Sequence, residues 1–327
     1  MEIMQKKNDL NNSELKMRFQ ERDGILLEAI QEYDGVMARR QIKSLFWKNK
    51  TLRAMEKRLA KLNQTGYIRW PEIQERKNYP IPEPIVWLDW RGALYLAGKQ
   101  GITVTEPKIP NENQLRMLEK SLRSKGFSWM REPRWSQLKH DLCIVDIRLW
   151  IKESLNTVPD LSVEEWINES VFRSDTDYVD YQIRTREGKT FNKRKGVCPD
   201  GSFTIIDDHR RLKSEPFRAR FLVEMDMATH DNPSFGFEKV LPGVAYIKSQ
   251  AYQKRFGNNS GRWLVVTTSP VRMRNLIQQT QARSGNESGL FLFTQFEHFM
   301  KENFFTEPIW KQKNDESPKP LIERIVK

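Results

Sequence analysis

The chain has 327 residues, of which 38% are hydrophobic and 30% charged, so it can bury a core while keeping a largely polar surface. No apolar run approaches the length of a membrane-spanning helix, and the polar first twenty residues lack the apolar stretch of a secretory signal. Its two cysteines, Cys143 and Cys198, fit neither a disulfide framework nor a paired zinc knuckle. We therefore expect a cytoplasmic protein with no membrane partner.

The positive charge is concentrated near the N-terminus. The formal net charge is +12, and residues 36–80 contain twelve Lys or Arg against three acids. This window alone carries most of the net charge, and the rest of the chain is nearly balanced. Such a distribution predicts a polyanionic partner that contacts mainly the N-terminal part.

The N-terminal region shows the element order of a winged helix. After a polar extension over residues 1–21, helical patterns cover residues 22–33, 39–47 and 50–65, strand patterns cover 67–70 and 85–90, and a further short helix covers 91–98. Three short helices followed by a two-stranded ribbon predict a winged-helix domain over residues 22–100.

The third of these helices separates apolar from cationic residues. Leu52, Met55, Leu59 and Leu62 recur at helical spacing, while Arg53, Lys57 and Lys61 are four residues apart on another side. Such a helix can dock on a small core and lie in a major groove, where cations meet phosphates or guanine edges. The predicted DNA-binding residues are Lys50, Arg53, Lys57, Arg58, Lys61, Arg69, Arg76 and Lys77. The alternative is a solvated basic face without a partner.

The remaining sequence predicts a second, mixed α/β domain. Residues 101–113 are rich in Pro, Thr and Asn and are interpreted as a linker. Helical patterns then cover 114–155, 239–256 and 272–282, with strand-like runs at 178–185, 202–207, 220–226 and 262–269. Residues 138–151 carry two apolar stripes, which predict a buried helix. We place this domain at residues 114–309 and a polar tail at 310–327.

Acidic residues in this domain follow a nuclease-like spacing. Pro199-Asp200 precedes one strand, and Glu224-Met225-Asp226 ends the next, which gives PD…ExD. The pattern PD…ExK marks restriction-endonuclease-like nucleases, in which the carboxylates bind Mg²⁺ and the lysine helps to orient water. Asp226 stands in place of that lysine, and Lys239 is a candidate substitute. The predicted catalytic residues are therefore Asp200, Glu224, Asp226 and Lys239, with Asp200 and Glu224 as Mg²⁺ ligands; the alternative is an ordinary turn and a solvated strand end.

Several blocks of the chain together resemble a known family. The chain is similar to plasmid replication-relaxation proteins in two series of runs. The first is IKSLFW, TLRAMEKRLAKLNQTGYIRW and PIVWLDWRGALYLAG, and the second is LKHDLCIVDIRL, CPDGSFTI, FLVEMDMAT, FEKVLPGVAYIKSQAYQKRFG and RWLVVTTSPVRMRNL. The resemblance covers roughly residues 22–282. It implies a plasmid or mobile-element protein of DNA replication or transfer with a nuclease-like second domain. Pro242, inside the helix expected after Lys239, departs from this pattern and argues against Lys239 as a catalytic group.

The sequence thus favours a binding protein over an enzyme. The leading hypothesis is a protein that binds double-stranded DNA, acts with replication or mobilisation proteins and carries an inactive nuclease-like domain; a homodimer is compatible with it. The first alternative is a Mg²⁺-dependent endodeoxyribonuclease targeted by its winged helix, and the second is a winged-helix transcriptional regulator. The aspartate at position 226 separates the first two, because it supplies no positive charge to a transition state.

Overall fold

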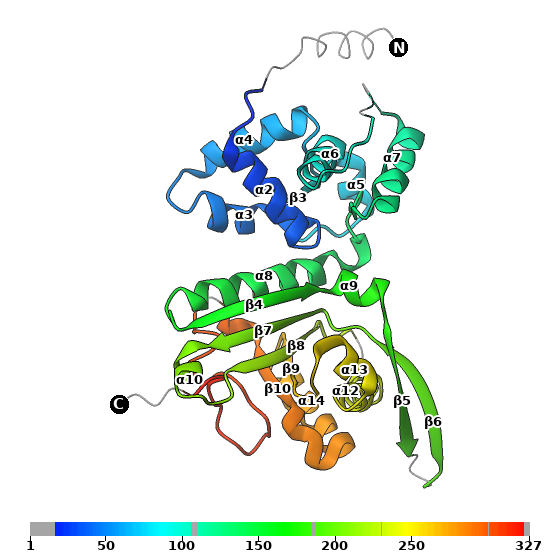
Figure 1. Ribbon diagram of the computed structural model, residues 1–327, viewed down its shortest axis with the longest axis vertical. Coiled ribbons are helices and arrows are strands. Elements are labelled where there is room, and N and C mark those ends of the chain that lie inside the picture. Colours follow the sequence, from blue (N-terminus) through cyan, green and yellow to red (C-terminus); the bar gives the residue numbers. More distant parts are fainter. Residues whose placement is uncertain are drawn as a thin grey trace. The chain divides into compact units, whose positions relative to one another are not determined.

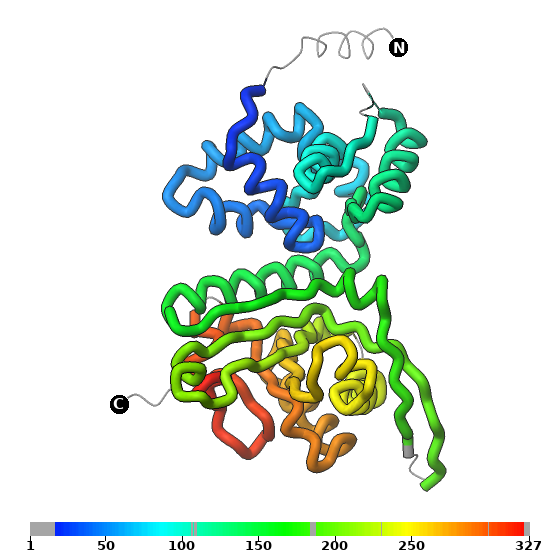
Figure 2. The backbone as a smooth tube through the Cα atoms, in the orientation of Figure 1, coloured from blue at the N-terminus to red at the C-terminus, as the bar shows by residue number. Residues whose placement is uncertain are grey.

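The computed structural model of the protein describes residues 17–323, except 106, 108, 109, 185–187, 230 and 300. The chain divides into two compact units, Met1–Val145 and Asp146–Lys327, and the division falls within helix α8 (Leu138–Leu155). Figures 1 and 2 show the elements along the chain. Across the described residues, no helix is both long enough and apolar enough to cross a membrane.

The first unit combines helices with a small antiparallel sheet. Its elements are α2 (Glu21–Glu32), β1 (Val36–Ala38), α3 (Arg39–Phe46), α4 (Leu52–Gln64), β2 (Ile68–Arg69), α5 (Ile73–Asn78), β3 (Ile85–Leu88), α6 (Trp90–Lys99), α7 (Glu112–Ser124) and the 3-10 turn η1 (Trp135–Gln137). The sheet order is β1-β3-β2, and both outer strands pair antiparallel with β3. The predicted helices and the two-stranded ribbon are therefore present, with a third strand added.

The added strand β1 was not predicted from the sequence because it is short and buried on both faces. Its three residues, Val-Met-Ala, show no polar–apolar alternation, and all are buried. The core of the unit also includes Trp87 of β3 and the first turns of α8, where Leu138 and Leu142 pack against this sheet. The Trp87 indole donates to the Arg131 carbonyl at 3.0 Å, which fixes the segment before α8.

The second unit is built on a mixed five-stranded sheet. Its elements are β4 (Leu161–Asn168), α9 (Glu169–Ser174), β5 (Asp177–Arg184), β6 (Thr190–Val197), β7 (Gly201–Asp207), α10 (Asp208–Leu212), β8 (Arg218–Asp226), α11 (Asn232–Phe235), the π-helical turn η2 (Gly236–Val240), α12 (Leu241–Ile247), α13 (Gln250–Phe256), β9 (Arg262–Thr267), α14 (Pro270–Ser284), η3 (Gly285–Leu290), β10 (Phe291–Gln295) and η4 (Phe296–His298). The sheet order is β10-β9-β8-β7-β4. Strand β7 is antiparallel to both neighbours, whereas β8, β9 and β10 are parallel.

Alternation along the strands gives this sheet two covered faces. Leu222, Trp263 and Val265 share one core cluster with residues of α12 and α14, such as Tyr246 and Leu276. On the other face, the Phe203 ring lies 5.7 Å from that of Trp166 and 6.3 Å from that of Phe304. Glu224 and Asp226 continue the Leu222 series of β8, so they lie on the face covered by α12 and α14.

Strands β4, β6 and β10 were not predicted, and β6 shows why. Its sequence, Thr-Phe-Asn-Lys-Arg-Lys-Gly-Val, is dominated by charged and polar residues, and its first five residues are exposed. Among the described residues it pairs with β5 alone, as a separate two-stranded sheet. Trp310, predicted as the start of a polar tail, is instead buried: its side chain is 2% exposed, and its backbone pairs with that of Lys319.

Both apolar stripes predicted for residues 138–151 are buried in α8. One stripe contains Leu138, Leu142, Val145 and Leu149, and the other contains Ile144, Ile147 and Ile151; each of these side chains is at most 6% exposed. The prediction of a buried helix is confirmed.

Candidate functional site

Helix α4 presents a cationic face opposite a fully buried one. Thr51 caps its first turn by accepting a hydrogen bond from the Ala54 amide at 3.3 Å. The side chains of Met55, Leu59 and Leu62 are completely buried. On the opposite side Arg53, Lys57 and Lys61 are exposed, one helical turn apart. Within the described part of the chain, these three side chains have no hydrogen-bond or ion-pair partner.

Arg58 lies beside this row but faces the protein. Its guanidinium forms a two-pronged ion pair with the completely buried Asp23 of α2, in which Nε donates to Oδ1 at 2.8 Å. The hydrogen bond to Asp23 raises the pKa of Arg58. This residue, predicted as a DNA contact, therefore joins α4 to α2.

The predicted cations outside α4 fall into two groups. Lys50 and Lys77 are exposed, and Arg76 is exposed with its Nε donating to the Pro71 carbonyl at 3.1 Å. Arg69 instead pairs with Glu75 at 2.9 Å and lies over the Trp87 ring. The solvent-facing candidates in this region are thus Lys50, Arg76 and Lys77, together with the row on α4.

Arg39 was not among the predicted residues, although it lies beside them. Its guanidinium lies 4.8 Å from the centre of the Trp70 ring. Burial lowers the pKa of Arg39, Glu56 of α4 raises it, and Arg76 of α5 lowers it. Arg39 is therefore close to both helices. A signal was present in the sequence, because Arg39 and Lys43 are four residues apart in the same short helix.

The second unit brings two of the predicted acids together. Asp200 directly precedes Gly201, whose partner across the β7–β8 pair is Val223, so Asp200 lies next to Glu224. An Asp200 oxygen accepts a hydrogen bond from the Met225 amide at 2.7 Å. Asp200 is 6% and Glu224 8% exposed. Two carboxylates so close in a buried place need a cation to offset their repulsion.

Lys239 provides a positive charge at this point. Its ammonium nitrogen lies 2.5 Å from Glu224 Oε1. Burial acts to lower the pKa of Lys239, but Glu224 and Asp200 outweigh it and raise the pKa above its ordinary value. The ammonium therefore stays charged at neutral pH, and Pro242 does not keep Lys239 away from Glu224.

The π-helical turn explains how the helix accommodates Pro242. Proline lacks the N–H that would bond the carbonyl four residues earlier, which here belongs to Glu238. That carbonyl accepts a hydrogen bond from Lys195 Nζ at 2.8 Å instead. The widened turn Gly236–Val240 absorbs the irregularity and directs Lys239 to Glu224.

Asp226, the third predicted acid, has a different partner. Arg272 of α14 clamps both of its oxygens, with Nε to Oδ2 and Nη2 to Oδ1 both at 2.7 Å. Thr267 adds a hydrogen bond at 3.3 Å. Asp226 thus lies on the same face of β8 as Glu224, but its charge is already compensated.

Comparison with known families gives one match. The family model described as replication-relaxation matches residues 27–261. The chain belongs to the replication-relaxation family. No curated protein and no solved structure matches it. The family match includes α4 and the Asp200–Glu224–Lys239 cluster, whereas Arg272, the partner of Asp226, lies beyond it.

Further polar groups of this replication-relaxation protein lie near the acid cluster. Cys198, two residues before Asp200, has its pKa raised to about 11, first by burial and then by the charge of Glu169. Arg148 donates to Asn168 at 3.1 Å, and Asn168 is the Cα partner of Gly201. Arg148 of α8 and Asn168 of β4 thus lie beside the start of β7, next to Asp200.

The carboxylates of this protein offer a small ligand set for a metal ion. Among the described residues, no group of three or more His, Cys, Asp or Glu side chains is arranged to hold one. Mg²⁺ is commonly bound through one or two carboxylates, with water and substrate phosphates completing its shell. Asp200 and Glu224 fit that mode, and Asp226 does not add to it because Arg272 occupies both of its oxygens.

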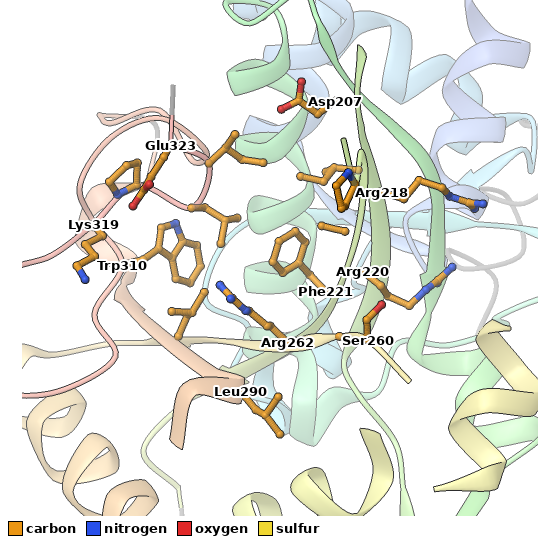
Figure 3. Close-up of a pocket in the computed structure, with 18 of the residues that line it drawn as sticks. Asp207, Arg218, Arg220, Phe221, Ser260, Arg262, Leu290, Trp310, Lys319 and Glu323 are labelled. Carbon is orange, nitrogen blue, oxygen red and sulfur yellow. The ribbon is translucent and has the colours of Figure 1, made fainter. Parts of the chain in front are cut away.

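The other end of the same sheet contains a pocket of about 710 Å³. It is formed by the starts of β8 and β9 and by the segment around Trp310, and Figure 3 shows the Arg262 side chain pointing between Trp310 and Phe221. Arg218 and Arg220 also line it, but their guanidinium groups point away from Trp310 in this view. Because Asp200 and Glu224 lie at the opposite ends of β7 and β8, this pocket is separate from the acid cluster.

Proposed function

We propose that this replication-relaxation protein binds double-stranded DNA through its first unit, in the replication or transfer of a plasmid or mobile element. The observation that carries the proposal is α4: one face is buried, and the other presents a row of three exposed cations that have no partner among the residues the structure describes. A helix of this kind can enter a major groove and place its cations against phosphates.

The surrounding elements support a winged-helix assignment. Helices α2, α3 and α4 and the β1-β3-β2 sheet have the order of that fold, with α4 in the position of the recognition helix. The segment between β2 and β3, which corresponds to the wing, carries the exposed Arg76 and Lys77. Both regions fall within the most basic window of the chain, which favours contact with a polyanion.

A second candidate function, metal-dependent cleavage of DNA, gains support from Lys239. The sequence argued against cleavage because Asp226 occupies the lysine position of the ExK pattern. Lys239 reaches Glu224 from another element and can supply the missing positive charge. In this assignment Asp200 and Glu224 hold Mg²⁺, which activates water against a phosphodiester, and Lys239 stabilises the charge that develops on the phosphate.

One experiment examines both functions. The protein is incubated with supercoiled plasmid and Mg²⁺ or Mn²⁺, and a gel separates retarded from nicked or linear DNA. Retardation without cleavage supports the binding function alone. Cleavage that disappears in Asp200→Ala and in Lys239→Ala supports the second function, while a plasmid that is neither shifted nor cut at low salt contradicts both.

A further inference from the structure

Strands β5 and β6 form a ribbon that is separate from the main sheet. They pair antiparallel over eight residues each, from Asp177↔Val197 to Arg184↔Thr190, and in the part of the chain that the structure describes neither pairs with a strand of the five-stranded sheet. Figures 1 and 2 show the pair running away from the body of the second unit. A ribbon of two strands is only marginally stable by itself and leaves its edges open.

The base of this ribbon is held firmly. Val179 and Val197 are buried in a core cluster with α12. Asp177 accepts hydrogen bonds from the Tyr246 hydroxyl at 2.6 Å and from Arg255 Nε at 2.5 Å. Lys195 pairs with the side chain of Glu238. One acid and one base of the ribbon are therefore neutralised inside the unit.

The outer part of the ribbon, from the Asp180–Arg194 pair to the Arg184–Thr190 pair, is basic. From Asp177 to Val197 the sequence has six Lys or Arg against three acids. Lys193 and Arg194 are exposed, and Phe191 is 52% exposed. Arg194 lies 5.5 Å from the centre of the exposed Tyr178 ring and opposite Asp180. Lys193 has no hydrogen-bond or ion-pair partner in the described part of the chain.

The base of the ribbon leads directly to the acid cluster. Strand β6 ends at Val197, and Asp200 follows three residues later. Lys193 precedes Asp200 by seven positions in the sequence, a span of at most about 23 Å for extended chain. One helical turn of B-DNA is about 34 Å long, so one duplex can meet both places within a single turn.

We propose that the outer part of the β5–β6 ribbon is a second DNA-contacting element, in which Lys193 and Arg194, which point to opposite faces of the strand, bind phosphates on the two sides of a groove in a duplex that also meets the Asp200–Glu224–Lys239 cluster. This inference rests on the proposed function, since it takes duplex DNA as the partner. It adds a contact that belongs to the second unit and is independent of α4. Two-stranded ribbons fit the width of a major groove, and their cations meet the phosphates that border it.

The test compares two double variants that lose the same charge. Lys193→Ala with Arg194→Ala removes the ribbon cations; Arg211→Ala with Lys213→Ala removes two exposed cations near α10, at the opposite end of β7. Affinity for a 40-base-pair duplex is measured by fluorescence anisotropy between 50 and 200 mM salt. Each lost phosphate contact lowers the slope of log K against log salt by about 0.9. The ribbon variant should therefore lose about 1.8 from the slope, and the α10 variant nothing.

Three outcomes separate this inference from the proposed function. A slope loss confined to the ribbon variant, with an unchanged thermal midpoint, supports the ribbon contact. A ribbon variant that matches the α10 variant, while wild type binds DNA with its normal salt dependence, overturns the ribbon contact and leaves the α4 proposal intact. Wild type that does not bind the duplex at any salt concentration overturns both. Lys193→Gln with Arg194→Gln repeats the test with more conservative side chains.

Discussion

Lys239 Nζ lies 2.5 Å from Glu224 Oε1, even though Pro242 follows three residues later in the same helical segment. The π-helical turn Gly236–Val240 precedes α12, and the Glu238 carbonyl that Pro242 cannot bond accepts a hydrogen bond from Lys195 Nζ instead. The consequence is a paired lysine beside two carboxylates, in a protein whose ExD motif lacks the usual lysine.

Breaking this pair should destabilise the protein. Lys239→Met leaves Glu224 buried without its cation, and we expect the free energy of unfolding to fall by about 1–3 kcal/mol, less than for a fully buried pair because Lys239 is partly exposed. Since the pKa of Lys239 is raised, this contribution is complete below about pH 10 and is lost only at higher pH. Urea titration at pH 7 measures it.

The matched control for that pair is Lys248→Met, which removes an exposed lysine paired with Glu287. Its effect should stay below about 0.5 kcal/mol. The double variant Glu224→Gln with Lys239→Met should recover part of the loss. Equal effects of Lys239→Met and Lys248→Met would show that the Glu224 pair contributes no special stability.

Replacing Arg58 and replacing its neighbour Lys57 on α4 should have very different effects on the stability of the protein. Arg58→Ala leaves the completely buried Asp23 carboxylate unpaired and should lower the free energy of unfolding by about 3 kcal/mol. Lys57→Ala removes an exposed cation and should change it by less than about 0.5 kcal/mol. Chemical denaturation of the two variants measures these free energies. An Arg58→Ala protein as stable as wild type would contradict the conclusion that the Arg58–Asp23 ion pair joins α4 to α2.

Arg272 should matter for stability in the same way. Its side chain is 9% exposed and donates hydrogen bonds to both Asp226 oxygens. Arg272→Ala should therefore lower the free energy of unfolding by about 3–5 kcal/mol. Arg274→Ala, two residues along the same helix and exposed, should cost little. The midpoints of thermal unfolding of the two variants test this prediction. Similar midpoints would mean that the ion pair between Arg272 and Asp226 does not stabilise the protein.

Cys198 should react slowly with alkylating agents at neutral pH. Its pKa of about 11 keeps the thiolate, which is the reactive form, scarce until the solution becomes strongly alkaline. Mass spectrometry of iodoacetamide adducts from pH 7 to 10 should show the Cys198 rate rising across the whole range, without the plateau of an ordinary thiol above about pH 9. A plateau near pH 8.5 would contradict the burial of this group.

The helices and the acid pair were readable from the sequence because their signals are local. Met55, Leu59 and Leu62 recur at helical spacing, and all three are buried. Asp200 and Glu224 flank strands that are consecutive in this sheet, so pairing of neighbours brought them together. The domain boundaries stay a prediction, as do the metal, the DNA contacts and the dimer.

The remaining features depend on distant partners, which periodicity does not reveal. Asp226 forms an ion pair with Arg272, forty-six residues later in the chain, and Arg58 forms one with Asp23, thirty-five residues earlier. The ribbon strand β6 is a polar and charged run whose two large apolar residues, Phe191 and Val197, are six residues apart, so it gave no strand signal. Pro242 was expected to interrupt a regular α-helix, whereas the helix contains a π-helical turn, Gly236–Val240, just before the proline.

The most direct test of DNA binding by α4 compares two triple variants of the first unit. Arg53→Ala, Lys57→Ala and Lys61→Ala remove the cationic row of α4; Arg116→Ala, Lys120→Ala and Arg123→Ala remove three exposed cations at similar spacing on α7. Duplex affinity is measured for both and for wild type from 50 to 200 mM salt. We predict that the α4 variant binds far more weakly and loses up to about 2.7 from the salt slope, while the α7 variant resembles wild type. An α4 variant that binds as wild type does at every salt concentration would contradict the assignment of α4 as the DNA-binding helix.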